Sequence, residues 1–333
     1  MPEEIPFVTD MITGYFKSQI VRTLATLSIA DWLAKGPASL GHLVEKTGAD
    51  ADGLERLLRA AVTLGFVVYA EGQYCATARL EVLREDHAPV SLKYWAISLA
   101  GPGHWGPWGR FPEAVKTGAV QSTAALGLSL FEHFAANPQE AADFMRFMQA
   151  SSESVQAEVL RLVDLSGATC AVDVGGGNGA LLCALAQANP RLKGVVYDLP
   201  HSRDAGLAFA DARGLADRIT IESGDFFASV PAGDVYLMKW ILHDWDDSAC
   251  IKILSNCRRA IAGQGRLVLV EYRLGEMSDP GRGALTDLNM LTLTGGRERT
   301  PAQYGQLLDA AGFRLESVKP TVTLFDILEA VTG

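Results

Sequence analysis

The sequence has little of what marks a secreted, metal-binding or membrane protein. Its 333 residues include only five cysteines, an odd number without a C-x-x-C pair, which disfavours a disulfide framework and a zinc site. No run of about 18 apolar residues occurs, and the N-terminal MPEEIPFVTD lacks the basic region of a signal peptide. We therefore expect reduced thiols, a cytoplasmic location, no membrane partner and no metal.

An excess of positive charge is also missing. The formal net charge is -10, and residues 1–100 hold nine Lys and Arg against twelve Asp and Glu. Because proteins that neutralise phosphates are usually basic, this balance disfavours nucleic acid as a partner. The 48% hydrophobic content is ample for a core, and the length favours two domains.

The first hundred residues predict helices and one β-hairpin. Apolar residues at helical spacing predict a helix from about Thr9 to Lys35, before Gly36-Pro37 stops it. Two shorter helices follow, and then two strands around Glu71-Gly72. This order is typical of a winged helix. We interpret it as a dimerisation module, and a DNA-binding regulator stays open as an alternative function.

From Thr169 onward, short apolar runs alternate with helical segments. Such alternation is typical of a parallel sheet covered by helices on both faces. The predicted fold class is therefore α/β, with a doubly wound, Rossmann-like sheet after the helical N-terminal domain. The runs predicted to form strands are CAVDV, KGVVYD, RITIES, DVYLMKW, RLVLVEYR, FRLESV and TLFDILEA.

A glycine-rich loop, DVGGGNG at 173–179, follows the first of these runs. Glycines there let the backbone turn tightly and approach a ligand without side-chain collision. Gly175, Gly177 and Ala180 also fit G-x-G-x-x-A, so a nicotinamide-dependent oxidoreductase is an alternative. An acid two residues before the first glycine and a third glycine favour the D-x-G-x-G-x-G form of methyltransferases. Asp198, at the end of the second run, can accept both hydroxyl hydrogens of a ribose.

Three later segments complete a family resemblance: GDFF at 224–227, MKWILHDWDD at 238–247 and GGRERT at 295–300. With the N-terminal module, the DVGGGNG loop, YDLP and NCRRAI, they follow the order found in caffeate-type small-molecule O-methyltransferases of plants and of bacterial natural-product biosynthesis. The chain resembles that family over nearly its whole length. The resemblance implies a class I methyltransferase fold, S-adenosyl-L-methionine as cofactor, S-adenosyl-L-homocysteine as product, and a homodimer through the N-terminal domain.

Domain boundaries follow from this resemblance. We expect a winged-helix-like dimerisation domain at 1–100 and a helical linker with acceptor-pocket residues at 101–165. The S-adenosylmethionine-binding catalytic domain would occupy 166–333.

The resemblance also implies the site residues. His243 would be the general base, supported by the carboxylates of Glu271 and Glu298. The cofactor contacts would be Gly175, Gly177, Asp198, Asp225, Phe226 and Lys239. The acceptor contacts would be Met145, Met148, Trp240, Asn289 and Met290.

A histidine suits this chemistry. A sulfonium methyl group is already activated, so the enzyme needs an acceptor lone pair in line with it and a destination for the hydroxyl proton. With an ordinary pKa of about 6.5, a histidine is mostly neutral near pH 7 and can take that proton. We expect a phenol-like hydroxyl on a small secondary metabolite. N- or C-methylation, hydroxylation, decarboxylation or a pericyclic step stay open, because fold does not settle reaction.

Overall fold

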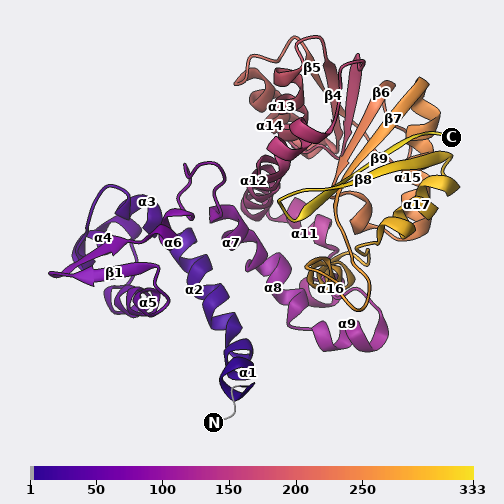
Figure 1. Cartoon of the computed structure of the whole chain (residues 1–333). Helices are drawn as coiled ribbons and strands as arrows, with labels where there is room; N and C mark the ends of the chain where they lie inside the picture. The colour runs from indigo at the N-terminus through magenta and orange to yellow at the C-terminus, as the bar shows by residue number, and fades with distance from the viewer. Residues whose placement is uncertain (1–3) are drawn as a thin grey trace. The chain divides into compact units, whose positions relative to one another are not determined.

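The structure, a computed structural model, describes residues 4–333 and divides into two compact units (Figure 1). The first comprises Met1–Trp105 and Phe134–Ala150, and the second Gly106–His133 and Ser151–Gly333. The expected linker at 101–165 is thus shared between both units, and the boundaries at 100 and 165 stay a prediction. Within residues 4–333, no helix is both long and apolar enough to cross a membrane.

The first unit is mainly helical, with one antiparallel hairpin. Its complete elements are α1 (Glu4–Ile12), α2 (Gly14–Thr26), α3 (Ile29–Leu33), α4 (Leu40–Thr47), α5 (Ala51–Thr63), β1 (Val67–Ala70), β2 (Gln73–Ala76), α6 (Ala78–Glu81) and α7 (Lys93–Leu99). Three helices have residues in both units: α8 (Pro102–Trp108), α11 (Leu130–Ala136) and α12 (Pro138–Leu162). The predicted hairpin is confirmed, whereas the winged-helix assignment stays a prediction.

The single helix predicted from Thr9 to Lys35 is wrong. The chain forms α1, α2 and α3 there, and Ser28, between the last two, has a left-handed φ of 53°. A continuous helix cannot contain such a residue, so the apolar stripe is redirected. Leu24 and Ile29 are fully buried in the core of this unit, while Phe16 is half exposed. Much of the apolar face predicted between Thr9 and Lys35 therefore packs against other parts of the same chain.

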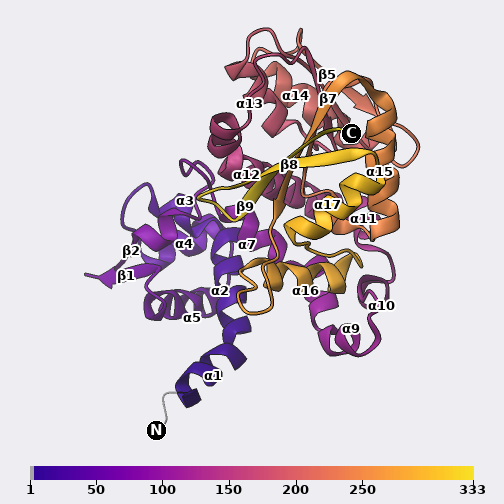
Figure 2. The ribbon, with the colours of Figure 1, turned by 45° about the vertical axis from the view of Figure 1, so that its right-hand side comes forward.

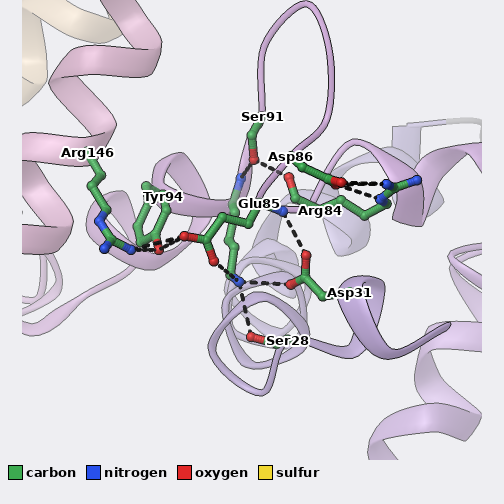
Figure 3. A network of polar contacts seen from close by, with 9 residues as sticks. Ser28, Asp31, Arg84, Glu85, Asp86, Ser91, Tyr94 and Arg146 are labelled. Atoms are coloured by element: carbon green, nitrogen blue, oxygen red, sulfur yellow. Dashed lines mark hydrogen bonds and ion pairs between the residues drawn. The ribbon is translucent and has the colours of Figure 1, made fainter. Parts of the chain in front are cut away.

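A buried lysine ties the helices of this unit together. Lys93 Nζ donates to Asp31 Oδ2 at 2.8 Å, to Glu85 Oε2 at 3.1 Å and to Ser28 Oγ at 3.1 Å. The second oxygen of Asp31 accepts the Glu85 backbone N–H at 2.8 Å (Figure 3). Because a buried cation needs paired charges, this network fixes the start of α7 against α3.

The second unit is a seven-stranded sheet in the order β5-β4-β3-β6-β7-β9-β8. Its strands are β3 (Cys170–Val174), β4 (Lys193–Asp198), β5 (Ile219–Ser223), β6 (Gly233–Lys239), β7 (Ile261–Tyr272), β8 (Phe313–Pro320) and β9 (Phe325–Thr332). All seven predicted runs are confirmed as strands. The sheet is mixed, however, because β9 pairs antiparallel with both β7 and β8. The short 321–324 connection allows only an antiparallel pair.

Helices cover both faces of this sheet. Figures 1 and 2 show α13 and α14 on one face and α15 and α17 on the other. The remaining elements of the unit are α9 (Phe111–Thr117), α10 (Ser122–Leu126), α13 (Ala180–Ala188), η1 (Pro200–Ser202), α14 (Arg203–Asp211), η2 (Leu242–Asp244), α15 (Asp247–Ala260), α16 (Gly283–Leu293) and α17 (Pro301–Ala310). Side chains from strands, α15 and α17 form one buried core, including Tyr236, Leu254 and Leu308.

The apolar side chains of α1 predict how two copies associate. Phe7 and Met11, one helical turn apart, are 65% and 60% exposed, although such residues are usually buried in a stable helix. Replacing both with serine should weaken the homodimer, because it removes apolar area that a partner would cover. Sedimentation velocity at micromolar concentration should show a larger monomer fraction, with Glu4→Gln as an unaffected surface control. An equal dimer fraction in the double variant would contradict this role of α1.

Candidate active site

The predicted site residues of the second unit gather at one edge of its sheet. β3, β4, β6 and β7 run parallel, so their carboxyl ends meet at the same edge. The glycine loop follows β3, and Asp198 ends β4. Lys239 ends β6, and Glu271 lies at the end of β7. In open α/β sheets this edge is where ligands bind.

Gly175 allows the loop to pass close to the end of β6. Its φ is +70°, and an added Cβ would lie 2.3 Å from Cδ1 of Ile241. Its backbone N–H donates to the carbonyl of Tyr197 on β4 at 2.8 Å. A side chain at position 175 would therefore strain the backbone and close the approach to the strand ends.

Backbone N–H groups hold Asp198 in place, and one of them belongs to the glycine loop. Its Oδ2 accepts the Gly177 N–H at 2.7 Å, and its Oδ1 accepts the Leu199 N–H at 2.6 Å. Burial raises the pKa of this carboxyl, while the two hydrogen bonds oppose that shift. Each oxygen keeps a further lone pair, so the carboxylate fits two ribose hydroxyls.

The other expected cofactor residues surround the same edge. Asp225 Oδ1 accepts the Phe227 N–H at 2.8 Å, which turns the chain after β5. Phe226 packs edge-on against Phe227, with ring centroids 5.0 Å apart. Lys239 is half-buried, and its Nζ lies 3.4 Å from Ser151 Oγ. Burial lowers the pKa of Lys239 to about 8, against the opposing charges of nearby carboxylates.

His243 lies on η2, just after β6, and is only 5% exposed. Its Nδ1 is 3.0 Å from Glu298 Oε1, a pair that joins residues 55 positions apart. Trp240 lies parallel to the imidazole, with ring centroids 5.5 Å apart and an interplanar angle of 12°. Since the carboxylate accepts a hydrogen bond here, Nδ1 carries the hydrogen when the ring is neutral, and the Nε2 lone pair is then left for another group.

Glu271 is arranged differently from Glu298. Its Oε1 accepts the backbone N–H groups of Ile241 at 3.2 Å and Leu242 at 3.1 Å. It therefore supports the backbone that carries His243, and it acts on the imidazole through its charge. Burial raises the pKa of Glu271 to about 7. The resemblance implied two carboxylates of one kind, whereas the structure gives them separate contacts.

Asp244 is a charged neighbour that the sequence analysis did not single out. Its Oδ1 lies 3.8 Å from His243 Nε2, and burial raises its pKa to about 6. Burial disfavours the charged imidazole, but Asp244, Glu298 and Glu271 together outweigh it and raise the pKa of His243 to about 9. The three carboxyl groups around the ring thus favour the charged imidazole, in contrast to the expectation of a mostly neutral His243 near pH 7.

His243, Glu271 and Glu298 each place one potential ligand atom within 4.8 Å of the others. This spacing could hold a metal ion. One oxygen of each carboxylate already serves another contact, however, since Glu298 Oε1 pairs with Nδ1 and Glu271 Oε1 accepts two backbone N–H groups. The cluster is thus a hydrogen-bonded histidine with two carboxylates around it.

The expected acceptor residues fall into two groups. Trp240 lies beside His243, and Met290 is buried on α16. Asn289 Oδ1 accepts the indole N–H of Trp108 at 2.7 Å, a contact that no spacing in the sequence could reveal. Met145 and Met148 lie on α12 within the first unit, so their acceptor contacts stay a prediction.

The first unit also contains a largely apolar cavity of about 850 Å³. Its walls come from α2, α6 and α7, and include Val21, Leu83, Trp95 and Leu99. No predicted site residue lines it.

Family models match both parts of the chain. An O-methyltransferase domain model matches residues 108–314, and an O-methyltransferase dimerisation domain model matches residues 9–83. The phenazine O-methyltransferase PhzM of Lysobacter antibioticus is 37% identical over 322 residues, which cover 96% of this chain and 94% of that protein.

Solved structures agree. That of LaPhzM superposes with a TM-score of 0.95 at 35% identity, covering 100% of both chains. NcsB1 of neocarzinostatin biosynthesis, solved with S-adenosyl-L-homocysteine and 1,4-dihydroxy-2-naphthoic acid, has a TM-score of 0.81 at 32% identity, covering 94% of this chain and 95% of that chain. With the glycine loop, Asp198 and the buried His243 at one sheet edge, these matches establish that the chain belongs to the O-methyltransferase family and is an S-adenosylmethionine-dependent O-methyltransferase.

Proposed function

We propose that the protein methylates a phenolic hydroxyl of a small aromatic natural product, with His243 as the general base. One observation carries the proposal: a buried imidazole whose Nδ1 is held by Glu298 at 3.0 Å, which leaves Nε2 to accept a proton. The relatives named above act on, or were solved with, fused aromatic compounds, which supports an aromatic acceptor. Membership of the O-methyltransferase family also argues against the two alternative functions, a nicotinamide-dependent oxidoreductase and a DNA-binding regulator.

The mechanism follows from the contacts of the base. S-adenosylmethionine supplies a methyl group already activated by its positively charged sulfur. His243 Nε2 takes the hydroxyl proton, so the acceptor oxygen gains a full lone pair for attack. Glu298 and Asp244 stabilise the resulting imidazolium, and Trp240 fixes the plane of the ring. Oxygen is favoured over amine nitrogen because a hydroxyl becomes a strong nucleophile once a base takes its proton, whereas a neutral amine already has a lone pair for attack.

We also propose that the predicted cofactor residues act as the resemblance implies. Gly175 would let the ligand approach the sheet edge, Asp198 would hold the ribose, and Phe226 would lie against the adenine. Lys239 and Gly177 would complete the contacts. A cytoplasmic location is supported by five unpaired cysteines, as expected for a reducing compartment.

Replacing Asp198 with alanine should weaken S-adenosylmethionine binding at least about tenfold, because two charge-assisted hydrogen bonds of about 1.5–3 kcal/mol each are lost. Isothermal titration calorimetry measures this directly. Asp211→Ala, an exposed carboxylate on α14, is the matched control and should bind normally. Unchanged affinity in the Asp198 variant would remove the ribose role.

His243→Ala should lower kcat by about 10²- to 10⁴-fold, the usual contribution of a positioned base. Cofactor affinity should change little, since the ring makes no expected cofactor contact. Rates over phenols of graded pKa test the role, because acidic phenols ionise without help and should lose less. An equal loss across the series would favour a purely positional histidine.

The raised pKa of His243 predicts the pH dependence. Below about 9 the ring is mostly charged and cannot accept a proton, so kcat/KM should rise toward that pH and then level. The acceptor used in this experiment should be a phenol with a pKa above about 10, so that its own ionisation does not contribute to the rising part of the pH profile. Asp244→Asn removes the charge that most raises the pKa of His243, so the rise of kcat/KM in this variant should occur at lower pH. A flat wild-type profile between pH 6 and 9 would contradict this protonation.

A further inference from the structure

We infer that Arg299 is a positioning residue that holds the turn carrying His243 in its reactive place. Its guanidinium binds the backbone of that turn, here called the base turn and defined as residues 240–245. The inference rests on the proposed role of His243 as the base. Every contact used lies within the second unit.

The base turn has weak support of its own. Its only regular element is η2, a three-residue 3₁₀ helix, and such short helices have few internal hydrogen bonds. At its start, Trp240 has a left-handed φ of +56°, which is costly for a large side chain. A turn of this kind keeps one geometry only when surrounding groups hold it.

Arg299 supplies much of that support. Its Nη1 donates to the carbonyl of Leu242 at 2.9 Å, and its Nη2 donates to the carbonyl of Trp245 at 2.8 Å. These two carbonyls flank His243 and Asp244. The planar guanidinium therefore spans the turn and fixes its two ends at a set separation.

The placement of Arg299 is costly, which argues for a specific role. The side chain is 1% exposed, and its one carboxylate partner among residues 4–333, Asp247 at 2.8 Å, is itself 60% exposed. Burying a cation with a half-solvated partner is unfavourable unless its hydrogen bonds are satisfied. The two turn carbonyls, a weaker contact to the Arg297 carbonyl at 3.3 Å, and Asp247 Oδ1, which accepts from Nε at 3.0 Å, satisfy them.

Two consecutive residues thus fix the base in two ways. Glu298 binds Nδ1 and sets the orientation of the ring, whereas Arg299 binds the backbone and sets where the ring stands. From the other side, Glu271 accepts the N–H groups of the turn. A misplacement of about 1 Å can cost about 10²-fold in rate. Loss of the two hydrogen bonds of the guanidinium to the base turn, its fork, should therefore lower the rate by displacing His243.

The test compares Arg299→Lys, which keeps the charge but loses the fork, with Arg299→Gln, which loses both. We expect kcat to fall at least about tenfold in each, while cofactor affinity by calorimetry stays within about twofold. The loss should be greater for weakly acidic phenols than for acidic ones, as for His243→Ala. Asp247→Asn is the matched control: it removes the ion pair, leaves the carbonyl contacts, and should keep its kcat.

A double variant separates positioning from general stability. If Arg299 acts through the base, His243→Ala with Arg299→Lys should be no slower than His243→Ala alone, within about twofold. A multiplied loss, a wild-type kcat in both Arg299 variants, or failure of both to bind cofactor would overturn the inference. A wild-type rate in His243→Ala would instead overturn the proposed base, so the two failures are distinguishable.

Discussion

The hydrogen bond between His243 Nδ1 and Glu298 Oε1 is the contact around which the catalytic unit is arranged. The bond forms because His243 directly follows β6 and because the 295–300 segment, which contains Glu298, lies beside it. Gly296 makes this return possible, because a Cβ there would lie 1.9 Å from the His243 carbonyl oxygen. The Arg297 N–H then donates to that same oxygen at 2.8 Å. The glycine, the glutamate and the arginine of one short segment thus serve a single turn.

Charge in a dry environment is the second constraint. Asp173 and Glu271 are buried at the same sheet edge and Lys239 and Asp244 are half-buried there, and desolvation shifts the pKa of each toward its neutral form. Such a site is expensive to fold, since each desolvated charge needs a partner. It suits a reaction between a positively charged methyl donor and an oxygen that becomes an anion, because fixed dipoles and charges act strongly where water is excluded.

The separation of tasks between the two carboxylates near His243 has a physical reason. A carboxylate that binds a ring N–H fixes the tautomer, and one that binds backbone N–H groups fixes the turn. Glu298 takes the first task and Glu271 takes the second. Asp244, adjacent in sequence to the base, adds the charge that most raises the pKa of the imidazole. The pKa of the proposed base is therefore set by neighbours that differ in both distance and contact.

The sequence by itself determined the order of strands and helices, the glycine loop and the identity of the candidate base. Strand periodicity and glycine chemistry are local, so they can be seen without the fold. The tertiary structure alone decided how α1, α2 and α3 divide one apparent helix, and that β8 and β9 close the sheet antiparallel. It also decided which carboxylate touches His243, and that Arg299 grips the base turn. Those contacts join segments about 55 residues apart, where spacing in the sequence carries no information on distance.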